Sequence, residues 1–274
     1  MQASRLDGPF GIEFRDVDIN QLTDDQFERI QAAQNEHGVI FLRNQRITPK
    51  QHVEFANRWG EIVVNRFFPK TENDDRIAVV KKTPQQQQVI GEQWHTDHSY
   101  DQAPAMGSIL YAKTVPSQGG NTNFASMYLA YEALSDGLKA TLEGMNAIHS
   151  SRHVFGDKAQ SLDPDNRFLN AELATQDSIH PVIISHPKSG KKALYVNPDF
   201  TIGFEGWTAE ESAPLLNYLF AHGQRSEFVV SYRWQKGDIA FWDNRATWHR
   251  ANNDYPTESR LMHRITLAGE PLYR

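Results

Sequence analysis

The sequence predicts an antiparallel β architecture decorated with helices, for three reasons. Helix signals concentrate in the first part of the chain, and strand-like segments concentrate in the later part. The two kinds of segment do not alternate regularly, as they would in a doubly wound parallel sheet. The 274 residues contain no internal repeat and no linker, so we expect a single domain over residues 1–274.

Three predicted helices begin with a threonine that is followed three positions later by Gln or Glu, the spacing of a capping box. They run over residues 23–38, 48–60 and 208–223, and each ends at a glycine. Glycine is the preferred residue just beyond a helix C-terminus. Regularly spaced leucines between Ser126 and Met145 predict one or two further helices.

The predicted strands are short and rich in β-branched or aromatic residues. They are Val39–Arg43, Ile77–Lys81, Gly107–Lys113, Pro181–Ser185, Lys192–Val196, Phe228–Trp234, Ile239–Trp242 and Arg260–Leu267. Residues 186–190 read His-Pro-Lys-Ser-Gly and predict the turn of a hairpin between two of these strands.

Two polar segments predict long loops. One lies near 83–90 and contains Pro84 and four glutamines, and the other lies near 157–178 and contains Pro164. Long loops inside a compact domain are often lids over an active site. We therefore expect lid-like insertions at both places, and plain surface insertions are the alternative.

Composition narrows the classes of function. The net charge of 28 − 34 = −6 argues against nucleic acid or an anionic membrane as partner. The apolar runs are too short to span a bilayer, and the N-terminal segment lacks the apolar core of a signal peptide, so we expect a cytoplasmic protein. The absence of cysteine excludes disulfides, thiolate metal sites and cysteine nucleophiles.

Three residues are candidate metal ligands. On a strand, His95 and Asp97 point to the same face, so they can present two ligands to one ion. His249 follows the predicted strand 239–242 and its turn, from which it can supply a third. Two imidazoles and a carboxylate form the facial triad of non-haem Fe(II) oxygenases. The same set suits a zinc hydrolase, and a simple exposed polar pair also accounts for His95 and Asp97 taken alone.

Two arginines predict an anion site. Arg260 and Arg264 share one face of a predicted strand, with Cα atoms roughly 13 Å apart. Two inward guanidiniums are costly unless anions meet them, and each can bind a carboxylate, sulfonate or sulfate through two hydrogen bonds. Pairing with internal acidic residues is the structural alternative. A non-catalytic anion-binding β-barrel is a further interpretation.

Several short motifs occur in order along the chain. They are Trp94–Asp97, Pro116–Thr122, Ala130–Leu134, His186-Pro187, Leu194–Asn197, Trp242–Arg245 and His263-Arg264. Together they resemble the taurine catabolism dioxygenase (TauD/TfdA-like) family of Fe(II)/2-oxoglutarate-dependent dioxygenases. The resemblance implies a double-stranded β-helix (jelly roll, cupin-like). It also implies an enzyme that uses Fe(II), 2-oxoglutarate and O2 to hydroxylate a substrate, with succinate and CO2 as co-products.

The resemblance assigns roles to the polar residues already described. His95, Asp97 and His249 match the iron ligands of the family. Thr122 and Arg260 match the positions that hold the far carboxylate of 2-oxoglutarate. The family also implies a homo-oligomer.

The substrate pocket is expected at a second group of residues. Arg264 matches the arginine that grips the substrate anion in sulfonate-using members, Phe155 and Phe200 match aromatic walls, and Asn197 lies nearby. Asn65 stands where taurine-using members carry a histidine, and an amide cannot carry positive charge. We therefore expect a small anionic substrate, with an alkyl sulfonate or alkyl sulfate ester as first choice and an aryloxyalkanoate or other carboxylate as second.

Overall fold

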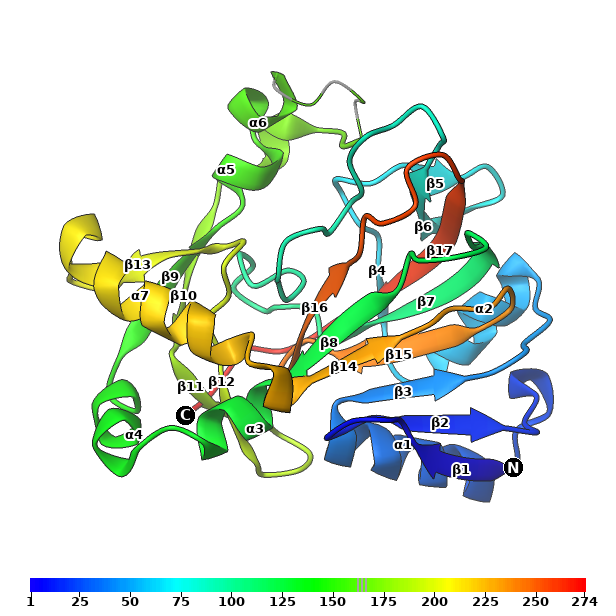
Figure 1. Cartoon of the computed structure of the whole chain (residues 1–274), viewed down its shortest axis with the longest axis horizontal. Coiled ribbons are helices and arrows are strands. Elements are labelled where there is room, and N and C mark those ends of the chain that lie inside the picture. Colours follow the sequence, from blue (N-terminus) through cyan, green and yellow to red (C-terminus); the bar gives the residue numbers. More distant parts are fainter. Residues whose placement is uncertain (162, 164, 166) are drawn as a thin grey trace.

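The computed structural model describes residues 1–161, 163, 165 and 167–274, and its framework is two facing β-sheets (Figure 1). The larger sheet has nine strands in the order β1-β2-β3-β15-β7-β17-β6-β5, with β4 paired to β17. These strands are β1 (Gln2–Arg5), β2 (Ile12–Arg15), β3 (Val39–Leu42), β4 (Ile62–Val63), β5 (Lys70–Thr71), β6 (Asp74–Lys82), β7 (Gly107–Thr114), β15 (Ile239–Asp243) and β17 (Arg260–Leu267).

The smaller facing sheet has the order β14-β8-β16. Its strands are β14 (Val229–Tyr232), β8 (Thr122–Ser126) and β16 (Thr247–Ala251). Buried rings join the two sheets: Phe41 of β3 stacks on Tyr232 of β14 at 3.9 Å, and Phe124 of β8 lies 5.7 Å from Trp242 of β15. This pair of antiparallel-rich sheets around a shared core confirms the predicted jelly roll.

Two helices cover the outer face of the larger sheet. Helix α1 (Asp24–His37) packs on β3 and β15, and α2 (Pro49–Asn57) packs on β6 and β17. Both begin with the predicted capping boxes, at Thr23 and Thr48. Gly38 ends α1 in the left-handed conformation at φ 72°, as its C-terminal position requires, whereas α2 ends at Asn57, before the predicted Gly60.

The remaining elements form a layer beside the sheets (Figure 1). It holds the sheet β10-β9-β13, the hairpin β11-β12 and the long helix α7, which packs on β13. Their bounds are β9 (Asn146–Ser150), β10 (Asp177–Pro181), β11 (Ile183–Ser185), β12 (Lys192–Leu194), β13 (Thr201–Phe204) and α7 (Ala209–Gly223). The shorter helices are α3 (Met127–Glu132), α4 (Asp136–Leu142), α5 (Arg152–Phe155), α6 (Asp157–Ser161), η1 (Ile19–Gln21), η2 (Ala171–Leu173) and η3 (Ser226–Phe228). Among the described residues, no helix has the length and apolarity needed to cross a membrane.

The predicted strands were right in kind and incomplete in number. The segment Pro181–Ser185 is divided between β10 and β11, and the turn at 186–190 does join the antiparallel hairpin β11-β12. Among the strands that were not predicted, β8 and β16 matter most for the site, because they carry Thr122 and His249. Both are five residues long and mix polar, small and aromatic residues, so their strand state comes from pairing with each other rather than from a local pattern.

The two segments expected to be lids differ from each other. Residues 83–90 contain no helix or strand, as expected, whereas 157–178 contains α6, η2 and the first residues of β10, so the expectation of a long loop was wrong there. Positions 162, 164 and 166 lie outside the described residues, and these include the proline of that prediction. Arg167 joins the segments, since its Nη1 donates to the Val89 carbonyl at 3.1 Å and its Nη2 donates to Oε1 of Gln88 at 2.7 Å.

Candidate active site

His95 and His249 are held together by their own backbones. The N–H of His95 donates to the carbonyl of His249 at 3.1 Å, and the N–H of His249 donates back at 2.8 Å. This single bridge attaches the loop before β7 to strand β16. The predicted strand through His95 and Asp97 is therefore reduced to one bridging residue followed by a turn. Ser108 of β7 nevertheless directs Asp97 toward the histidines by donating to its Oδ2 at 2.9 Å.

The three buried side chains converge with the spacing of metal ligands. Nε2 of His95 lies 3.8 Å from Oδ1 of Asp97, and Nε2 of His249 lies 3.8 Å from Oδ2. These separations are too long for hydrogen bonds, and they suit atoms that each lie about 2 Å from one shared ion. Nδ1 of His95 donates to the Gln93 carbonyl at 2.8 Å, which leaves its Nε2 free to ligate. The residues therefore fit an Fe(II) ion.

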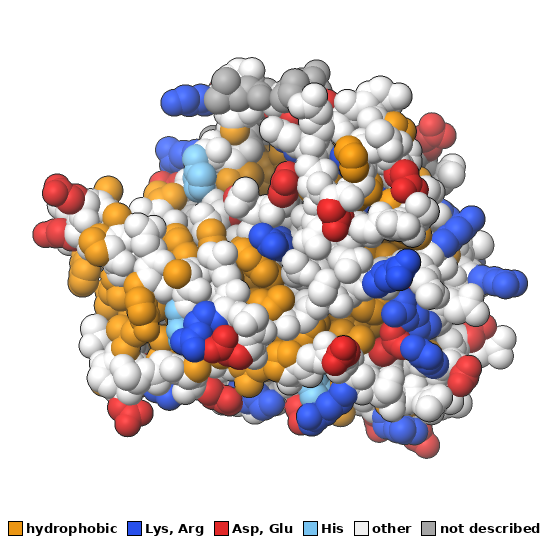
Figure 2. All heavy atoms as spheres, in the orientation of Figure 1, with side chains coloured by type: hydrophobic (Ala, Val, Ile, Leu, Met, Phe, Trp, Pro, Cys, Tyr) orange, Lys and Arg blue, Asp and Glu red, His pale blue; other side chains and the backbone are white. Residues whose placement is uncertain are grey.

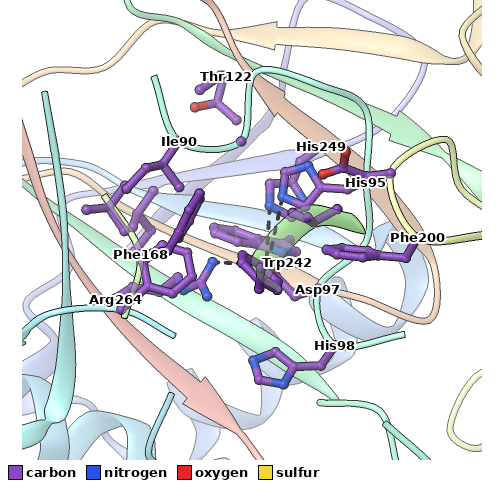
Figure 3. A pocket seen from close by; sticks show the side chains of 18 of the residues that line it. Ile90, His95, Asp97, His98, Thr122, Phe168, Phe200, Trp242, His249 and Arg264 are labelled. Atoms are coloured by element: carbon purple, nitrogen blue, oxygen red, sulfur yellow. Dashed lines mark hydrogen bonds and ion pairs between the residues drawn. The ribbon is translucent and has the colours of Figure 1, made fainter. Parts of the chain in front are cut away.

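Arg264 lies directly beside this cluster (Figure 3). Its Nη1 donates to Oδ1 of Asp97 at 3.0 Å, and its guanidinium lies over the ring of Phe68 at 4.6 Å. Burial raises the pKa of Asp97, but the positive charge of Arg264 outweighs this effect and holds the pKa well below its usual range. Burial also lowers the pKa of His249 well below its usual value, so its imidazole is neutral and able to bind a metal.

Arg260 and Arg264 both point inward from β17, as predicted, and are 5% and 6% exposed. Within the described residues no carboxylate lies within ion-pair distance of Arg260, and its Nε has no partner. Its Nη2 donates to Oγ1 of Thr122 at 3.3 Å. Burial of this unpaired cation lowers the pKa of Arg260. A buried guanidinium without a counter-ion fits a site whose anion is brought by a ligand, such as the far carboxylate of 2-oxoglutarate.

A cavity opens onto these residues (Figure 3). The predicted Phe155 and Phe200 line it, together with Phe68 and Phe168. The rings of Phe155 and Phe168 lie 5.0 Å apart, and Phe200 lies 6.3 Å from His95. These four rings, the aromatic wall, lie beside the charged groups: Phe68 contacts Arg264, and Phe200 lies next to His95. Such a cavity suits a partly apolar molecule with an anionic group.

The family model described as "Taurine catabolism dioxygenase TauD, TfdA family" matches residues 2–266. The chain belongs to this family. It is 33% identical to the alkylsulfatase of Acinetobacter baylyi, over 98% of this chain and 86% of that protein. It is 34% identical to the alpha-ketoglutarate-dependent sulfate ester dioxygenase of Pseudomonas putida, over 96% of this chain and 88% of that protein.

Solved structures of the TauD/TfdA family have the same fold. The crystal structure of a taurine dioxygenase from Burkholderia xenovorans matches with a TM-score of 0.82 at 31% identity, over 98% of this chain and 91% of that one. The chain is therefore a 2-oxoglutarate-dependent dioxygenase, and Fe(II), 2-oxoglutarate and O2 are the cofactors of its class. The zinc hydrolase and the non-catalytic barrel considered from sequence do not agree with these relationships.

Two residues expected in the substrate pocket of this TauD/TfdA-family enzyme lie behind its wall. Neither Asn65 nor Asn197 lines the cavity. Asn65 Oδ1 accepts from the N–H of Phe67 at 2.9 Å, so its Nδ2 donates to Nε2 of His98 at 3.1 Å. Asn197 Oδ1 accepts from the N–H of Phe200 at 2.9 Å. Each asparagine therefore positions a lining residue and does not contact the cavity itself.

Sequence reasoning missed two polar lining residues, His98 and Asp199. His98 follows Asp97 directly and lies in a turn with a left-handed backbone, at φ 59°. The sequence pattern does not predict this conformation. The Asp199 carboxylate has no hydrogen bond or ion pair to any described residue, and burial raises its pKa. Its position just before the predicted Phe200 was the one available signal for it.

Proposed function

We propose that this enzyme hydroxylates a small anionic organic substrate, and that the substrate is an alkyl sulfonate or an alkyl sulfate ester. The observation that carries the proposal is Arg264, a buried guanidinium that faces the cavity beside Asp97. Two relatives that align with nearly the whole chain are named for alkyl sulfates and sulfate esters, which supports the same chemical class here. A guanidinium matches a sulfate or sulfonate through paired hydrogen bonds.

We assign the predicted roles to the converging residues. His95, Asp97 and His249 hold Fe(II), Thr122 and Arg260 hold the far carboxylate of 2-oxoglutarate, and Arg264 holds the substrate anion. Support comes from the convergence of the three ligand atoms and from the lack of a carboxylate partner for Arg260 within the described residues.

The protein's part in the reaction is orientation and exclusion of water. When bound, Fe(II) with 2-oxoglutarate and O2 supplies the oxidising chemistry, which yields succinate and CO2 beside the hydroxylated product. Arg264 fixes the anionic end of the substrate, and the rings of Phe155 and Phe200 press its apolar part toward the His95 side of the cavity. We propose that segments 83–90 and 157–178, within one domain of residues 1–274, act as lids, because Ile90 and Phe168 of these segments line the cavity.

An aryloxyalkanoate is the second candidate substrate, and the aromatic wall favours it. Phe68, Phe155, Phe168 and Phe200 surround the cavity with rings, which suits a substrate that itself contains a ring. The carboxylate of such a molecule can bind Arg264 as a sulfonate can.

We also propose a cytoplasmic homo-oligomer that has no nucleic-acid or membrane partner. The net charge of −6 supports the absence of those partners. Figure 2 shows hydrophobic side chains gathered over α7 and β13, where Ile202, Trp207 and Tyr218 are about half exposed, and such a patch suits contact between subunits. Light scattering coupled to size-exclusion chromatography tests this, and a monomer at micromolar concentration contradicts it.

An anaerobic titration tests the proposed function. The Fe(II)–2-oxoglutarate complex of such an enzyme has a visible absorption band that shifts when a substrate enters. Alkyl sulfates, alkyl sulfonates and aryloxyacetates are added in turn, and aerobic succinate release is measured with the same panel. We expect a sulfate or sulfonate to give both the shift and stimulated succinate release. A response to aryloxyacetates alone selects the second candidate, and a response to no anion refutes the assignment of Arg264.

A further inference from the structure

The hydroxyl of Thr122 receives two hydrogen bonds from neighbouring side chains. Nε1 of Trp234 donates to Oγ1 of Thr122 at 2.9 Å, and Nη2 of Arg260 donates to the same atom at 3.3 Å. All three residues are buried. A hydroxyl has two acceptor lone pairs and one proton to donate. Because both lone pairs are engaged, the proton of Thr122 is available only to an acceptor beyond these two residues.

Trp234 can hold this orientation because its own position is fixed. It follows strand β14, whose Tyr232 pairs with Thr122 of β8, so the sheet register brings the indole to the threonine. The ring of Tyr232 packs edge-on against Trp234 at 5.1 Å, and the Arg260 guanidinium lies 5.9 Å from the indole ring. An indole N–H is a donor only, so it cannot exchange roles with the hydroxyl.

An anion would satisfy both residues, because Thr122 needs an acceptor for its proton and Arg260 needs a negatively charged partner. The guanidinium is buried without a carboxylate partner among the described residues, and its Nε is unpaired. Arg260 and the oriented hydroxyl therefore present donors side by side to a single anion. We propose that Trp234 is a positioning residue for the cosubstrate: its indole N–H fixes the Thr122 hydroxyl as a donor to the far carboxylate of 2-oxoglutarate. This inference rests on the proposed roles of Thr122 and Arg260.

Trp234→Phe tests the proposal because it removes the N–H and retains an aromatic ring. We expect the Kd for 2-oxoglutarate, measured by anaerobic titration of the Fe(II) enzyme, to rise about tenfold, because a poorly oriented hydroxyl is a weaker donor to an anion. The Kd for 2-oxovalerate, which lacks the far carboxylate, should change less than about twofold. The ratio of the Kd for 2-oxoglutarate to the Kd for 2-oxovalerate is insensitive to a general loss of folded protein. Trp59→Phe is the matched control, because it removes an indole N–H that has no partner among the described residues, on the outer face of the larger sheet, and it should alter neither value.

A double-mutant cycle with Thr122→Val separates positioning from a structural role. If Trp234 acts through the hydroxyl, Trp234→Phe has no further effect on 2-oxoglutarate binding in the Thr122→Val background. Independent, multiplicative effects overturn the inference, as does an unchanged ratio in Trp234→Phe. If Thr122→Val and Arg260→Leu themselves leave 2-oxoglutarate binding unchanged, the proposed function's cosubstrate assignment fails first. If both weaken binding and Trp234→Phe does not, this inference alone is refuted.

Discussion

Arg264 donates a hydrogen bond from Nη1 to Oδ1 of Asp97 at 3.0 Å, so one guanidinium contacts both the proposed metal ligand and the substrate cavity. An anion that binds Arg264 is therefore placed next to the three candidate metal ligands, His95, Asp97 and His249.

Arg264→Ala should weaken substrate binding far more than 2-oxoglutarate binding. Loss of a buried charge-assisted pair predicts a rise in substrate KM of about 100-fold, while the Kd for 2-oxoglutarate stays within about threefold. Steady-state kinetics with varied substrate and anaerobic 2-oxoglutarate titration measure the two effects. An equal loss of both would show that the two arginines do not have separate ligands.

Asp97→Ala should abolish substrate-dependent succinate formation, because two imidazoles alone bind the metal weakly. It also leaves Arg264 buried without its partner, so we expect a loss of unfolding free energy of about 3 kcal/mol in urea denaturation. Asp75→Ala, at an exposed site on β6, is the control and should change neither quantity. Undiminished turnover in Asp97→Ala would refute the ligand assignment.

Arg167→Ala should loosen the two proposed lids. It removes the hydrogen bonds to Val89 and Gln88 that join the segments, and a bond to Asp163 within one of them. We expect a substrate KM raised roughly fivefold and faster proteolysis within 83–90, since a surface contact of this kind is worth about 1 kcal/mol. Arg76→Ala, which breaks an exposed pair with Asp74, is the matched control. Equal proteolysis rates in the two variants would contradict the lid assignment.

Asp199→Asn should strengthen the binding of simple anions. The unpaired carboxylate lines the same cavity as the proposed anion site, and its negative charge opposes an anionic ligand. The KM of an alkyl sulfate should therefore fall, whereas a substrate that also carries an ammonium group should bind more weakly. Kinetics with an alkyl sulfonate and its amino-substituted analogue distinguish the two effects. A rise in KM for both would mean that Asp199 supports the wall and does not act through charge.

His52 predicts a pH dependence of stability that does not involve the active site. This buried residue of α2 packs edge-on against Tyr111, and burial, aided by the charge of His263, lowers its pKa to about 3. Between that value and the unfolded pKa near 6.5, the unfolded chain binds a proton that the folded chain does not. Stability therefore rises with pH across this window, and His52 alone removes about 2 kcal/mol between about pH 8 and pH 5.

His52→Leu should remove this part of the pH dependence. Urea denaturation of both proteins at the two pH values measures the free energy of unfolding. Between the higher and the lower pH, the variant should lose less of this free energy than the wild type. A constant difference between the two proteins would show that His52 has the same pKa in the folded and unfolded states, which contradicts the lowered pKa.

Sequence predicted those features that depend on local patterns. The capping boxes at Thr23, Thr48 and Thr208 need only residues three positions apart, and the inward face shared by Arg260 and Arg264 follows from the two-residue period of a strand. The resemblance of the chain to the TauD/TfdA family added the jelly roll, which no local pattern specifies.

The features that sequence reasoning missed depend on contacts between distant segments. Trp234 reaches Thr122 across 112 positions of the chain, and His98 enters the cavity because its turn is left-handed. Asn65 was expected in the cavity and lies behind it, because the N–H of Phe67 takes its amide oxygen. Side-chain direction within a turn is set by such hydrogen bonds, and residue spacing does not reveal it.

Strand β17 is paired on both sides, with β6 and with β7, and carries Arg260 and Arg264 four residues apart. A shift of its register by one residue would turn both guanidiniums away from the cavity, so insertions and deletions in this strand should eliminate activity. Changes in substrate preference should therefore come from the segments around Asn65, 83–90 and 157–178. Given the proposed roles of Arg260 and Arg264, the strand maintains both anion sites while these segments can vary.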